Sequence, residues 1–316
     1  MTTSVVAMTV IGSGAISKAA YAEPVDTENL PAVWIQVSPT SQRLSLDPGS
    51  HHEGKFVVSN IGSGGFGFKV YAGSYKIGDV NYENVSYDSD TPRTQISRWI
   101  KFKKTDFYLD SGESAVVEYT VDVPSSVASG GQYAILFAET KPEQSSSGVT
   151  AIKRIGSVVY SRISGDTREE GRIVSLDVKS FHFSPSDAES FVMATSVVEN
   201  TGNVDFDAEY KLDVKSIFGK SAFSNTRTHS VLPDEDIKQR KVLMEWNDAP
   251  KLGIFRVTHD VKIAALDQEQ SITKIVIIVP MFLIIVVVMV IVLLIVAIVT
   301  KKKRDKGRKK KTRINH

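Results

Sequence analysis

The chain has 316 residues, of which 38 are Lys or Arg, 36 are Asp or Glu and none is Cys. The absence of Cys excludes thiol catalysis, thiolate zinc sites and disulfide bonds, so the folded part depends on its hydrophobic cores. The last sixteen residues carry ten basic residues and one acid, which leaves 28 basic and 35 acidic residues, or a net charge of −7, for the remainder. That remainder offers no basic surface, and nucleic acid is therefore excluded as a partner.

The first 22 residues resemble a secretory signal peptide. A short apolar region from Val5 to Ile16 is followed by Ala20-Tyr21-Ala22, a small-residue cleavage pattern, although no Lys or Arg precedes the apolar region and Lys18 follows it. The apolar run is too short to span a bilayer. We therefore expect a cleaved signal rather than a second membrane helix.

From Val33 to Asp260 the periodicity is that of β-strands. The clearest alternation runs from Val204 to Val214, with apolar side chains on one face and charged side chains on the other. Turn signals such as Asp47-Pro48-Gly49 separate such runs, and no amphipathic helix intervenes. The predicted fold class is all-β, with antiparallel sheets packed as tandem immunoglobulin-like β-sandwiches and followed by one transmembrane α-helix.

An internal repeat indicates two sandwiches. Val57-Val58-Ser59-Asn60-Ile61-Gly62 recurs 140 residues later as Val197-Val198-Glu199-Asn200-Thr201-Gly202, whereas Leu109 and Leu232 begin a second pair of matching segments only 123 residues apart. The first copy therefore contains 17 extra residues, the length of the irregular polar stretch 78–94. We expect each Asn-x-Gly to turn the chain at a strand end, because Asn and Gly both tolerate positive φ.

From Ile275 to Thr300 no residue is charged. These 26 residues would form a helix of about 39 Å, longer than the ~30 Å hydrocarbon core of a bilayer, so the segment can span with some tilt, even with Pro280 one turn in. Basic residues near a membrane helix stay on the cytoplasmic side, so we expect the sandwiches outside the cytoplasm. The anchor residues are Ile275, Pro280, Thr300, Lys301, Lys302, Lys303 and Arg304.

These features predict a single-pass plasma membrane protein with extracellular N-terminal domains and a cytoplasmic C-terminus. The predicted order is a signal peptide (1–22), a first sandwich (31–166) with an insertion (78–94), a second sandwich (170–268), a transmembrane helix (275–300) and a basic tail (301–316). Membrane lipid is a partner of the helix and of the tail.

The first sandwich resembles a known family in several short motifs. They are Trp34-Ile35-Gln36-Val37-Ser38-Pro39-Thr40, Leu46-Asp47-Pro48-Gly49, Val57-Val58-Ser59-Asn60, and Val123-Pro124 leading to Gly130-Gly131-Gln132-Tyr133. These are similar to the first domain of the WxL-interacting cell-surface proteins of Gram-positive bacteria, which also share the overall architecture. The resemblance implies a cell-envelope adaptor whose first domain contacts peptidoglycan and whose second contacts a partner cell-surface protein.

Catalytic and cofactor motifs find no suitable context. Gly62-Ser63-Gly64-Gly65-Phe66-Gly67 matches a dinucleotide fingerprint, but a strand pattern follows it where a helix would be needed, so we expect turn residues and no cofactor. The sequence contains no nucleophile elbow, so we expect no enzyme. An envelope hydrolase is kept as a remote alternative, because sandwiches can host unrelated sites.

The histidines and the acids of the insertion are the candidate metal ligands. His51-His52 are expected in a solvated turn, His259 in a core and Asp205 with Asp207 on a solvated strand face. The insertion acids, among them Asp88 and Asp90, lack an EF-hand spacing, although calcium remains an alternative there. We therefore assign no metal site.

A binding surface is the remaining possibility. Aromatic residues with polar neighbours are typical of recognition surfaces, and Tyr75, Tyr82, Tyr87 and Trp99 lie in or beside the insertion. The alternative is that Trp99 starts a core strand and the tyrosines shield a loop; open strand edges offer another binding mode. We predict a non-catalytic binding or adaptor protein of the envelope, with recognition of carbohydrate or peptidoglycan by the first domain alone as the alternative.

Overall fold

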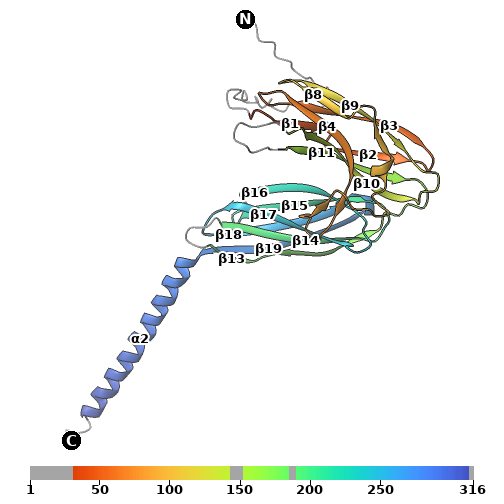
Figure 1. Cartoon of the computed structure of the whole chain (residues 1–316). Helices are drawn as coiled ribbons and strands as arrows, with labels where there is room; N and C mark the ends of the chain where they lie inside the picture. The colour runs from red at the N-terminus through yellow and green to blue at the C-terminus, as the bar shows by residue number, and fades with distance from the viewer. Residues whose placement is uncertain (1–30, 143–151, 185–189, 313–316) are drawn as a thin grey trace.

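The computed structural model describes residues 31–142, 152–184 and 190–312. Two β-sandwiches meet at one end, and a long helix leaves the second sandwich at its other end (Figure 1). This arrangement confirms the predicted fold class. The predicted signal peptide and the last four residues of the tail lie outside the described residues.

The first sandwich packs a four-stranded sheet against a five-stranded sheet. The four-stranded sheet has the order β1 (Ile35–Ser38), β3 (His51–Asn60), β9 (Ser114–Asp122) and β7 (Ile100–Phe102). The five-stranded sheet has the order β2 (Ser41–Leu46), β11 (Arg154–Ile163), β10 (Gly130–Thr140), β4 (Phe66–Ser74) and β8 (Asp106–Leu109). Their facing side chains, such as Phe56, Phe68 and Leu136, form one continuous buried core.

The second sandwich packs three strands against five. The smaller sheet has the order β12 (Gly171–Val178), β14 (Ser190–Asn200) and β17 (Gln239–Ala249). The larger has the order β13 (Phe181–Ser184), β19 (Gln268–Pro280), β18 (Gly253–Ile263), β15 (Phe206–Ser216) and β16 (Ser221–Val231), with a 3₁₀ turn η2 (Ala264–Leu266) before β19. The alternation predicted for 204–214 lies in β15, where Phe206, Leu212 and Val214 are fully buried.

Two strand pairs are parallel, so the expectation of purely antiparallel sheets was wrong. Strand β2 pairs with β11 and β13 pairs with β19 in parallel, and each pair lies at the edge of a five-stranded sheet. In each sandwich, a short strand near the start of the unit pairs with the last strand of the same unit, which is far away in the sequence. Local periodicity indicates strands but not the direction of such pairing.

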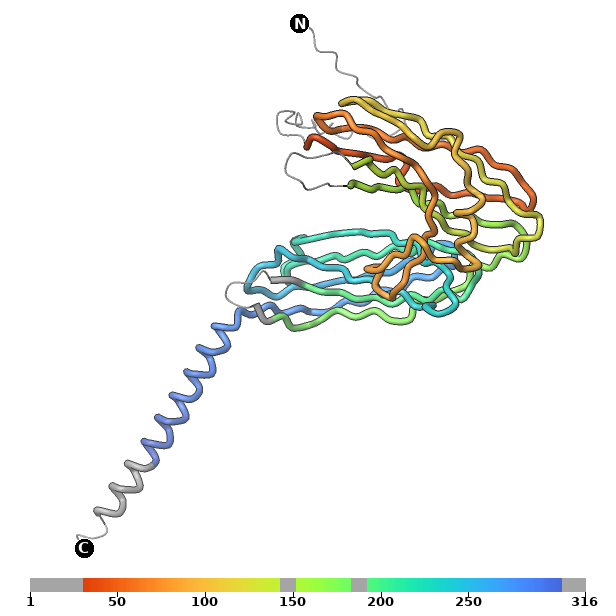
Figure 2. The backbone as a smooth tube through the Cα atoms, viewed as in Figure 1, coloured from red at the N-terminus to blue at the C-terminus, as the bar shows by residue number. Residues whose placement is uncertain are grey.

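The insertion forms a small substructure of its own. Strand β5 (Lys76–Ile77) pairs with β6 (Val85–Ser86), and the helical turn α1 (Ile96–Trp99) returns the chain to the first core, where Ile96 and Trp99 are buried. Figure 2 shows this orange segment reaching from the first sandwich onto the strands of the second. The insertion therefore lies at the junction of the two sandwiches.

The membrane helix begins later than the sequence predicted. Strand β19 continues to Pro280, and α2 starts only at Met281 and runs to Thr312. Ile275 and Pro280 thus belong to a strand, in which Val276 and Ile278 are buried in the second core. The uncharged end of the strand, 275–280, and the uncharged part of the helix, 281–300, form one continuous apolar run in the sequence. The helix has one candidate membrane span, Met281–Lys302, none of which is buried in the protein.

The two copies of the sequence repeat adopt the same local geometry. The Asn60 amide donates to the carbonyl oxygens of Gly64 (2.8 Å) and Leu109 (3.3 Å), and the Asn200 amide donates to those of Val204 (2.9 Å) and Val231 (2.7 Å). In each copy the amide oxygen accepts from the glycine N–H two residues on.

Glycine is required in this motif because a side chain would clash with a neighbouring segment, and not because the backbone has a positive φ. A Cβ on Gly62 would lie 2.6 Å from the Trp34 nitrogen, and one on Gly202 would lie 2.1 Å from the Arg168 oxygen. Neither glycine has a positive φ, so the expected conformational reason was wrong. A close approach of a neighbouring chain segment is what each position requires.

Candidate functional site at the junction of the sandwiches

A third apolar cluster fills the corner between the sandwiches. It is separate from the two cores and draws on both units: Ile77, Tyr133 and Leu232 are buried in it, and Tyr75, Tyr82 and Tyr160 pack against them. The Tyr75 and Tyr133 rings each meet the Tyr160 ring nearly edge-on, with centroids 6.1 Å apart. Burial raises the pKa of the Tyr133 hydroxyl far above its ordinary value. The tyrosines are therefore neutral packing groups.

A buried carboxylate ties the two units together beside this cluster. Asp205 lies just before strand β15 of the second sandwich and is 1% exposed. It accepts from the Arg43 guanidinium (Nη1–Oδ2 2.5 Å) and from the Tyr133 hydroxyl (3.3 Å), both in the first sandwich. Arg43 also donates to Asp207 (2.6 Å) and to the Ser230 hydroxyl (3.1 Å). Because the Asp205 carboxylate holds partners from the first sandwich, breaking this contact would leave a buried charge unpaired.

The expectation that Asp205 faces solvent was therefore wrong. The alternation that predicts strand β15 breaks just before it, where Val204, Asp205 and Phe206 are all buried. Arg43 was missed altogether, because nothing local to β2 shows that its partner lies 162 residues away.

Backbone contacts of the insertion continue the junction on the other side. The Val80 carbonyl accepts from the Lys241 N–H (2.6 Å), and the Asp79 carbonyl accepts from the Arg240 guanidinium (3.0 Å). The Tyr82 ring packs on His229, with centroids 5.1 Å apart, and its hydroxyl donates to the Ser230 carbonyl (3.3 Å). Tyr82 has a φ of 63°, a costly conformation for a bulky residue, which these contacts hold in place.

The linker between the sandwiches, residues 164–170 between β11 and β12, is held in place by Asn203. Its side chain accepts from the Arg168 N–H (2.6 Å) and donates to the Asp166 carbonyl (2.7 Å). Its backbone carbonyl accepts from the Gly131 N–H (2.8 Å) and from Arg93 (2.9 Å). With apolar, ionic and backbone contacts all present, the junction behaves as an ordered interface and not as a flexible linker.

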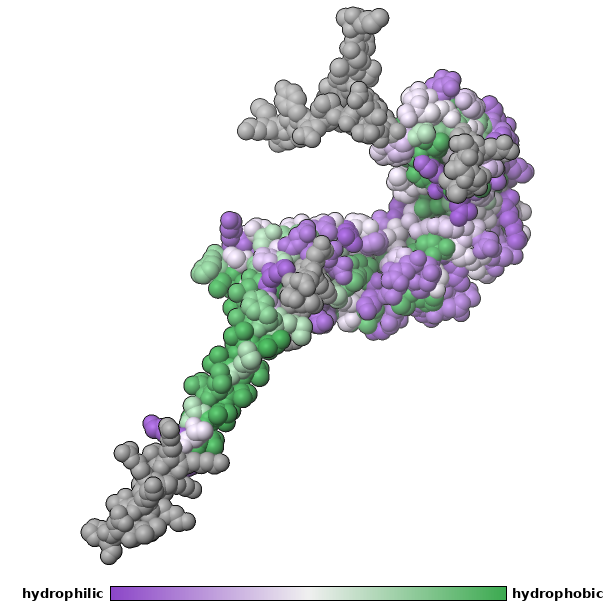
Figure 3. Space-filling view, turned by 60° about the vertical axis from the view of Figure 1, so that its left-hand side comes forward, coloured by the Kyte–Doolittle hydropathy of each residue, from purple (hydrophilic) through white to green (hydrophobic). Residues whose placement is uncertain are grey.

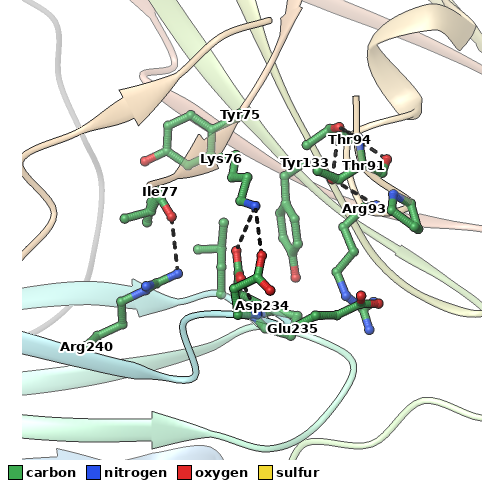
Figure 4. Close-up of a pocket in the computed structure, with 14 residues that line it drawn as sticks. Tyr75, Lys76, Ile77, Thr91, Arg93, Thr94, Tyr133, Asp234, Glu235 and Arg240 are labelled. Atoms are coloured by element: carbon green, nitrogen blue, oxygen red, sulfur yellow. Dashed lines mark hydrogen bonds and ion pairs between the residues drawn. The ribbon is translucent and has the colours of Figure 1, made fainter. Parts of the chain in front are cut away.

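A small cavity lies inside the junction (Figure 4). It has a volume of about 100 Å³, and Lys76 points across it toward Asp234 (3.7 Å) and Asp236 (3.9 Å). Arg240, 1% exposed, reaches the Ile77 carbonyl (3.4 Å), and burial lowers the pKa of its guanidinium. Ligand pockets usually measure 300–1,000 Å³, so this cavity fits a packing defect between interlocked units better than a substrate site.

Two wider hollows, of about 450 and 340 Å³, flank Arg43 on the surface. The smaller lies between strand β2 of the first sandwich, which contributes Ser41, and strand β16 of the second, which contributes Thr228. Within the described residues, no group of three or more His, Asp or Glu is placed to hold a metal ion.

The aromatic residues predicted to form a binding surface are used inside the chain. Tyr75 and Tyr82 belong to the junction, and Trp99 is 9% exposed in the first core. Tyr87 packs edge-on against Phe137, with centroids 5.1 Å apart. Tyr82 therefore packs against the second sandwich, whereas Tyr87 and Trp99 pack within the first. Trp99 follows the alternative expectation of a core residue, which corrects its assignment to an outward recognition surface.

The other candidate ligands have intramolecular partners as well. His51 lies in strand β3, not in a turn, and its Nδ1 lies 2.7 Å from Asp122. Asp90 pairs with Arg98 (2.6 Å) and Asp88 accepts from Ser86 (3.1 Å), so the insertion acids are dispersed. His259 is fully buried, as the sequence predicted, with its Nδ1 3.0 Å from the Lys211 carbonyl.

Among known proteins, similarity to this chain was found only in solved structures. No protein-family model matches the chain, and no curated protein matches it. The solved structures similar to it include the class 5 fimbriae chaperone CfaA (12% identity, 77% of this chain and 98% of that one, TM-score 0.35). The E. coli chaperone DraB (10%, 78% and 97%, 0.36) and the Pseudomonas aeruginosa CupB2 chaperone (10%, 76% and 99%, 0.35) are others. The fold assignment rests on the sheets and cores described above.

Proposed function

We propose that this chain is a membrane-anchored, non-catalytic binding protein that displays two fixed β-sandwiches at the cell surface and engages a partner protein there. The observation that supports this most is the direct connection of the second sandwich to the membrane helix, because strand β19 ends at Pro280 and α2 starts at Met281. With no linker between them, the sandwich is held at the membrane and its open edges are presented in one orientation.

The partner site that we propose is the free edge of β16. This strand has 11 residues and pairs only with β15 among the described strands. Natural edge strands are usually kept short, covered or protected by Lys and Pro, because exposed backbone groups recruit other strands. The edges of the first sandwich have six residues or fewer, and β17 is partly covered by the Val80 contact. Strand β16 contains no Lys or Pro, and the contacts of Tyr82 and Arg43 reach only its C-terminal end near Ser230. The rest of its edge stays open, which favours addition of a partner strand.

The resemblance to the WxL-interacting proteins supports a Gram-positive envelope as the setting, with peptidoglycan as a second contact of the first sandwich. Its Gly130–Tyr133 motif, however, faces the junction: Gln132 and Tyr133 are 4% and 1% exposed, and Gln132 donates to the Pro92 carbonyl (2.6 Å). We therefore favour a protein partner over glycan recognition at this motif.

Photo-crosslinking in intact cells tests the edge. A photoreactive amino acid at Thr226, exposed on β16, should capture one dominant surface protein, whereas the same group at Tyr108, exposed on the first sandwich, should not. The purified partner should then bind the full-length protein, and the paired substitutions Thr226→Lys and Thr228→Lys should weaken binding by about tenfold or more, since charges on an edge oppose strand addition. Unchanged affinity would refute the edge as the site. Retention by purified cell wall without a protein partner would favour the glycan alternative.

A further inference from the structure

The end of the second sandwich nearest the membrane carries exposed apolar residues on two hairpin tips. Phe218, in the turn between β15 and β16, is 91% exposed, and Leu252, in the turn between β17 and β18, is 61% exposed. Ile217 and Ile254 beside them are each more than 40% exposed. In Figure 3 the hydrophobic colour of the helix continues onto this end of the sandwich. Such a patch marks an interaction site.

Strand register places both tips close to the start of the membrane helix. Gly253, which follows Leu252, pairs with Ile278, three residues before Met281. At about 3.3 Å per residue, this puts the Leu252 tip roughly 10 Å or less above the helix start. Ser216 pairs with Phe255, which pairs with Val276, so the Phe218 turn projects in the same direction.

The turn that carries Phe218 is ordered. The Gly219 N–H donates to the Ser216 carbonyl (2.8 Å), the Ser216 N–H donates to the Lys220 carbonyl (2.8 Å), and Gly219 has a φ of 83° that suits glycine. The aromatic ring is thus held outward by a defined turn, and no described part of the chain covers it. A solvated Phe in a fixed turn is costly unless another surface receives it.

The charge of the tips also differs from that of the exterior. The segment outside the membrane has a net charge of −7, yet the residues 217–220 and 249–254 contain two lysines, Lys220 and Lys251, and no acid. Aromatic and aliphatic side chains with lysines beside them are typical of segments that enter the interfacial zone of a bilayer. The lysine ammonium groups then reach the lipid phosphates.

We propose that the Phe218 and Leu252 tips insert into the headgroup region of the same bilayer that α2 crosses, so that the second sandwich rests on the lipid surface. The bilayer is the occupant because the patch is continuous with the candidate membrane span Met281–Lys302. The helix and the two tips then form a three-point attachment, which fixes the tilt of the sandwich and the direction in which β16 and the first sandwich point.

The absence of Cys allows a direct test with the full-length chain in lipid nanodiscs. Single cysteines at Phe218→Cys and Leu252→Cys are labelled with an environment-sensitive fluorophore, and lipids carry a nitroxide quencher near the headgroup. Quenching at both tips should exceed by about threefold that at Asp248→Cys, an exposed polar site close to Leu252 that controls for tethering near the helix, because only inserted groups reach the quencher. Tyr108→Cys provides the distant control.

Equal quenching at the tips and at Asp248 would overturn the proposal. So would a label that is shielded from water but not quenched by lipid, since that result would mean that the tips contact protein, such as a second copy of this chain. In a second measurement, Phe218→Ser with Leu252→Ser should change energy transfer from a Tyr108→Cys label to the bilayer surface, whereas Val116→Ser, an exposed apolar site on the first sandwich, should not. Unchanged transfer would also refute the three-point attachment. The inference rests on the anchor of the proposed function, and nanodisc incorporation tests that anchor separately.

Discussion

A single buried polar side chain makes important contacts between the two sandwiches. Asp205 joins the sandwiches through Arg43 and Tyr133, and its position 1% exposed leaves it no water to replace those partners. Asp207, two residues on, touches the same guanidinium but is half exposed. The two acids therefore make chemically similar contacts in different dielectric surroundings, and this difference decides their contributions.

We predict that Asp205→Ala destabilises the junction by about 2 kcal/mol, because it leaves the buried Tyr133 hydroxyl without its acceptor and leaves Arg43 only its more exposed partners, Asp207 and Ser230. Asp207→Ala should cost about 0.5 kcal/mol or less, as expected for an exposed pair. Hydrogen exchange of the junction amides, such as the Gly131 N–H, reports the difference. Equal effects of the two substitutions would contradict a special role for the buried carboxylate.

Two buried histidines, His182 and His259, and the half-buried His229 predict a pH dependence. Desolvation lowers the pKa of His259 below its ordinary value of 6.5, and the pKa values of His182 and His229 shift the same way for the same main cause. The unfolded chain then binds more protons than the folded one just below pH 6.5, so stability is complete above that pH and declines as the pH falls.

Replacing His259 should flatten this decline. In His259→Gln, which keeps a donor for the Lys211 carbonyl, we expect the loss of unfolding free energy between pH 7 and pH 5 to be smaller by about 1 kcal/mol. Denaturant titrations at both pH values measure it. Tyr108→Ala, at an exposed site, should retain the full slope, and a slope that survives in His259→Gln would assign the effect to other groups.

Elements show where sequence reasoning succeeded and where it could not. The period of two predicted β15, because its buried and exposed residues alternate within one strand. It could not predict that β19 continues to Pro280, because the apolar end of this strand and the apolar helix after it have the same composition. Nor could it place Tyr82, whose surroundings come from strand β16, about 150 residues away.

The sequence repeat identified the Asn-x-Gly motif, and the hydrogen bonds of its Asn side chain can be tested by substitution. Asn200→Asp keeps the acceptor for the Gly202 N–H but loses both donor bonds to the buried Val204 and Val231 carbonyls. We predict a loss of about 2–3 kcal/mol for the second sandwich, since unsatisfied buried carbonyls each cost about 1 kcal/mol or more. Asn60→Asp should weaken the first sandwich similarly in thermal unfolding. A tolerated substitution in either copy would mean that the motif only terminates the strand.

The insertion should fix the angle between the sandwiches. Tyr82→Ala removes the ring that packs on His229, and we expect about 2 kcal/mol less junction stability together with a wider range of interdomain distances in pulsed spin-label measurements. Tyr108→Ala removes an equally large but 64% exposed ring and should leave both unchanged. An unaltered distance distribution in Tyr82→Ala would show that the linker contacts of Asn203 are sufficient.

At the scale of the whole molecule, fold class followed from local pattern while the arrangement of the sandwiches did not. Each core is formed by residues whose alternation is visible in the sequence. The junction depends on isolated side chains such as Arg43 and Asn203, whose partners belong to the other unit. Strand periodicity can be recognised in a single sequence, whereas one contact between two residues far apart in the chain produces no periodic pattern.

Orientation in the membrane is the property that all proposed surface contacts require. The basic residues that follow the span, beginning with Lys301 and Lys302, should hold the C-terminus in the cytoplasm. On intact cells lacking a wall, added protease should digest the sandwiches and spare a C-terminal epitope. Replacing the ten basic tail residues with Gln should let about a tenth or more of the molecules adopt other topologies, in which the epitope is digested, because that charge bias sets orientation. A chain that keeps its epitope protected after these changes would have its orientation set by the N-terminal segment instead, and sandwiches that resist an accessible protease while the epitope is lost would reverse the assignment.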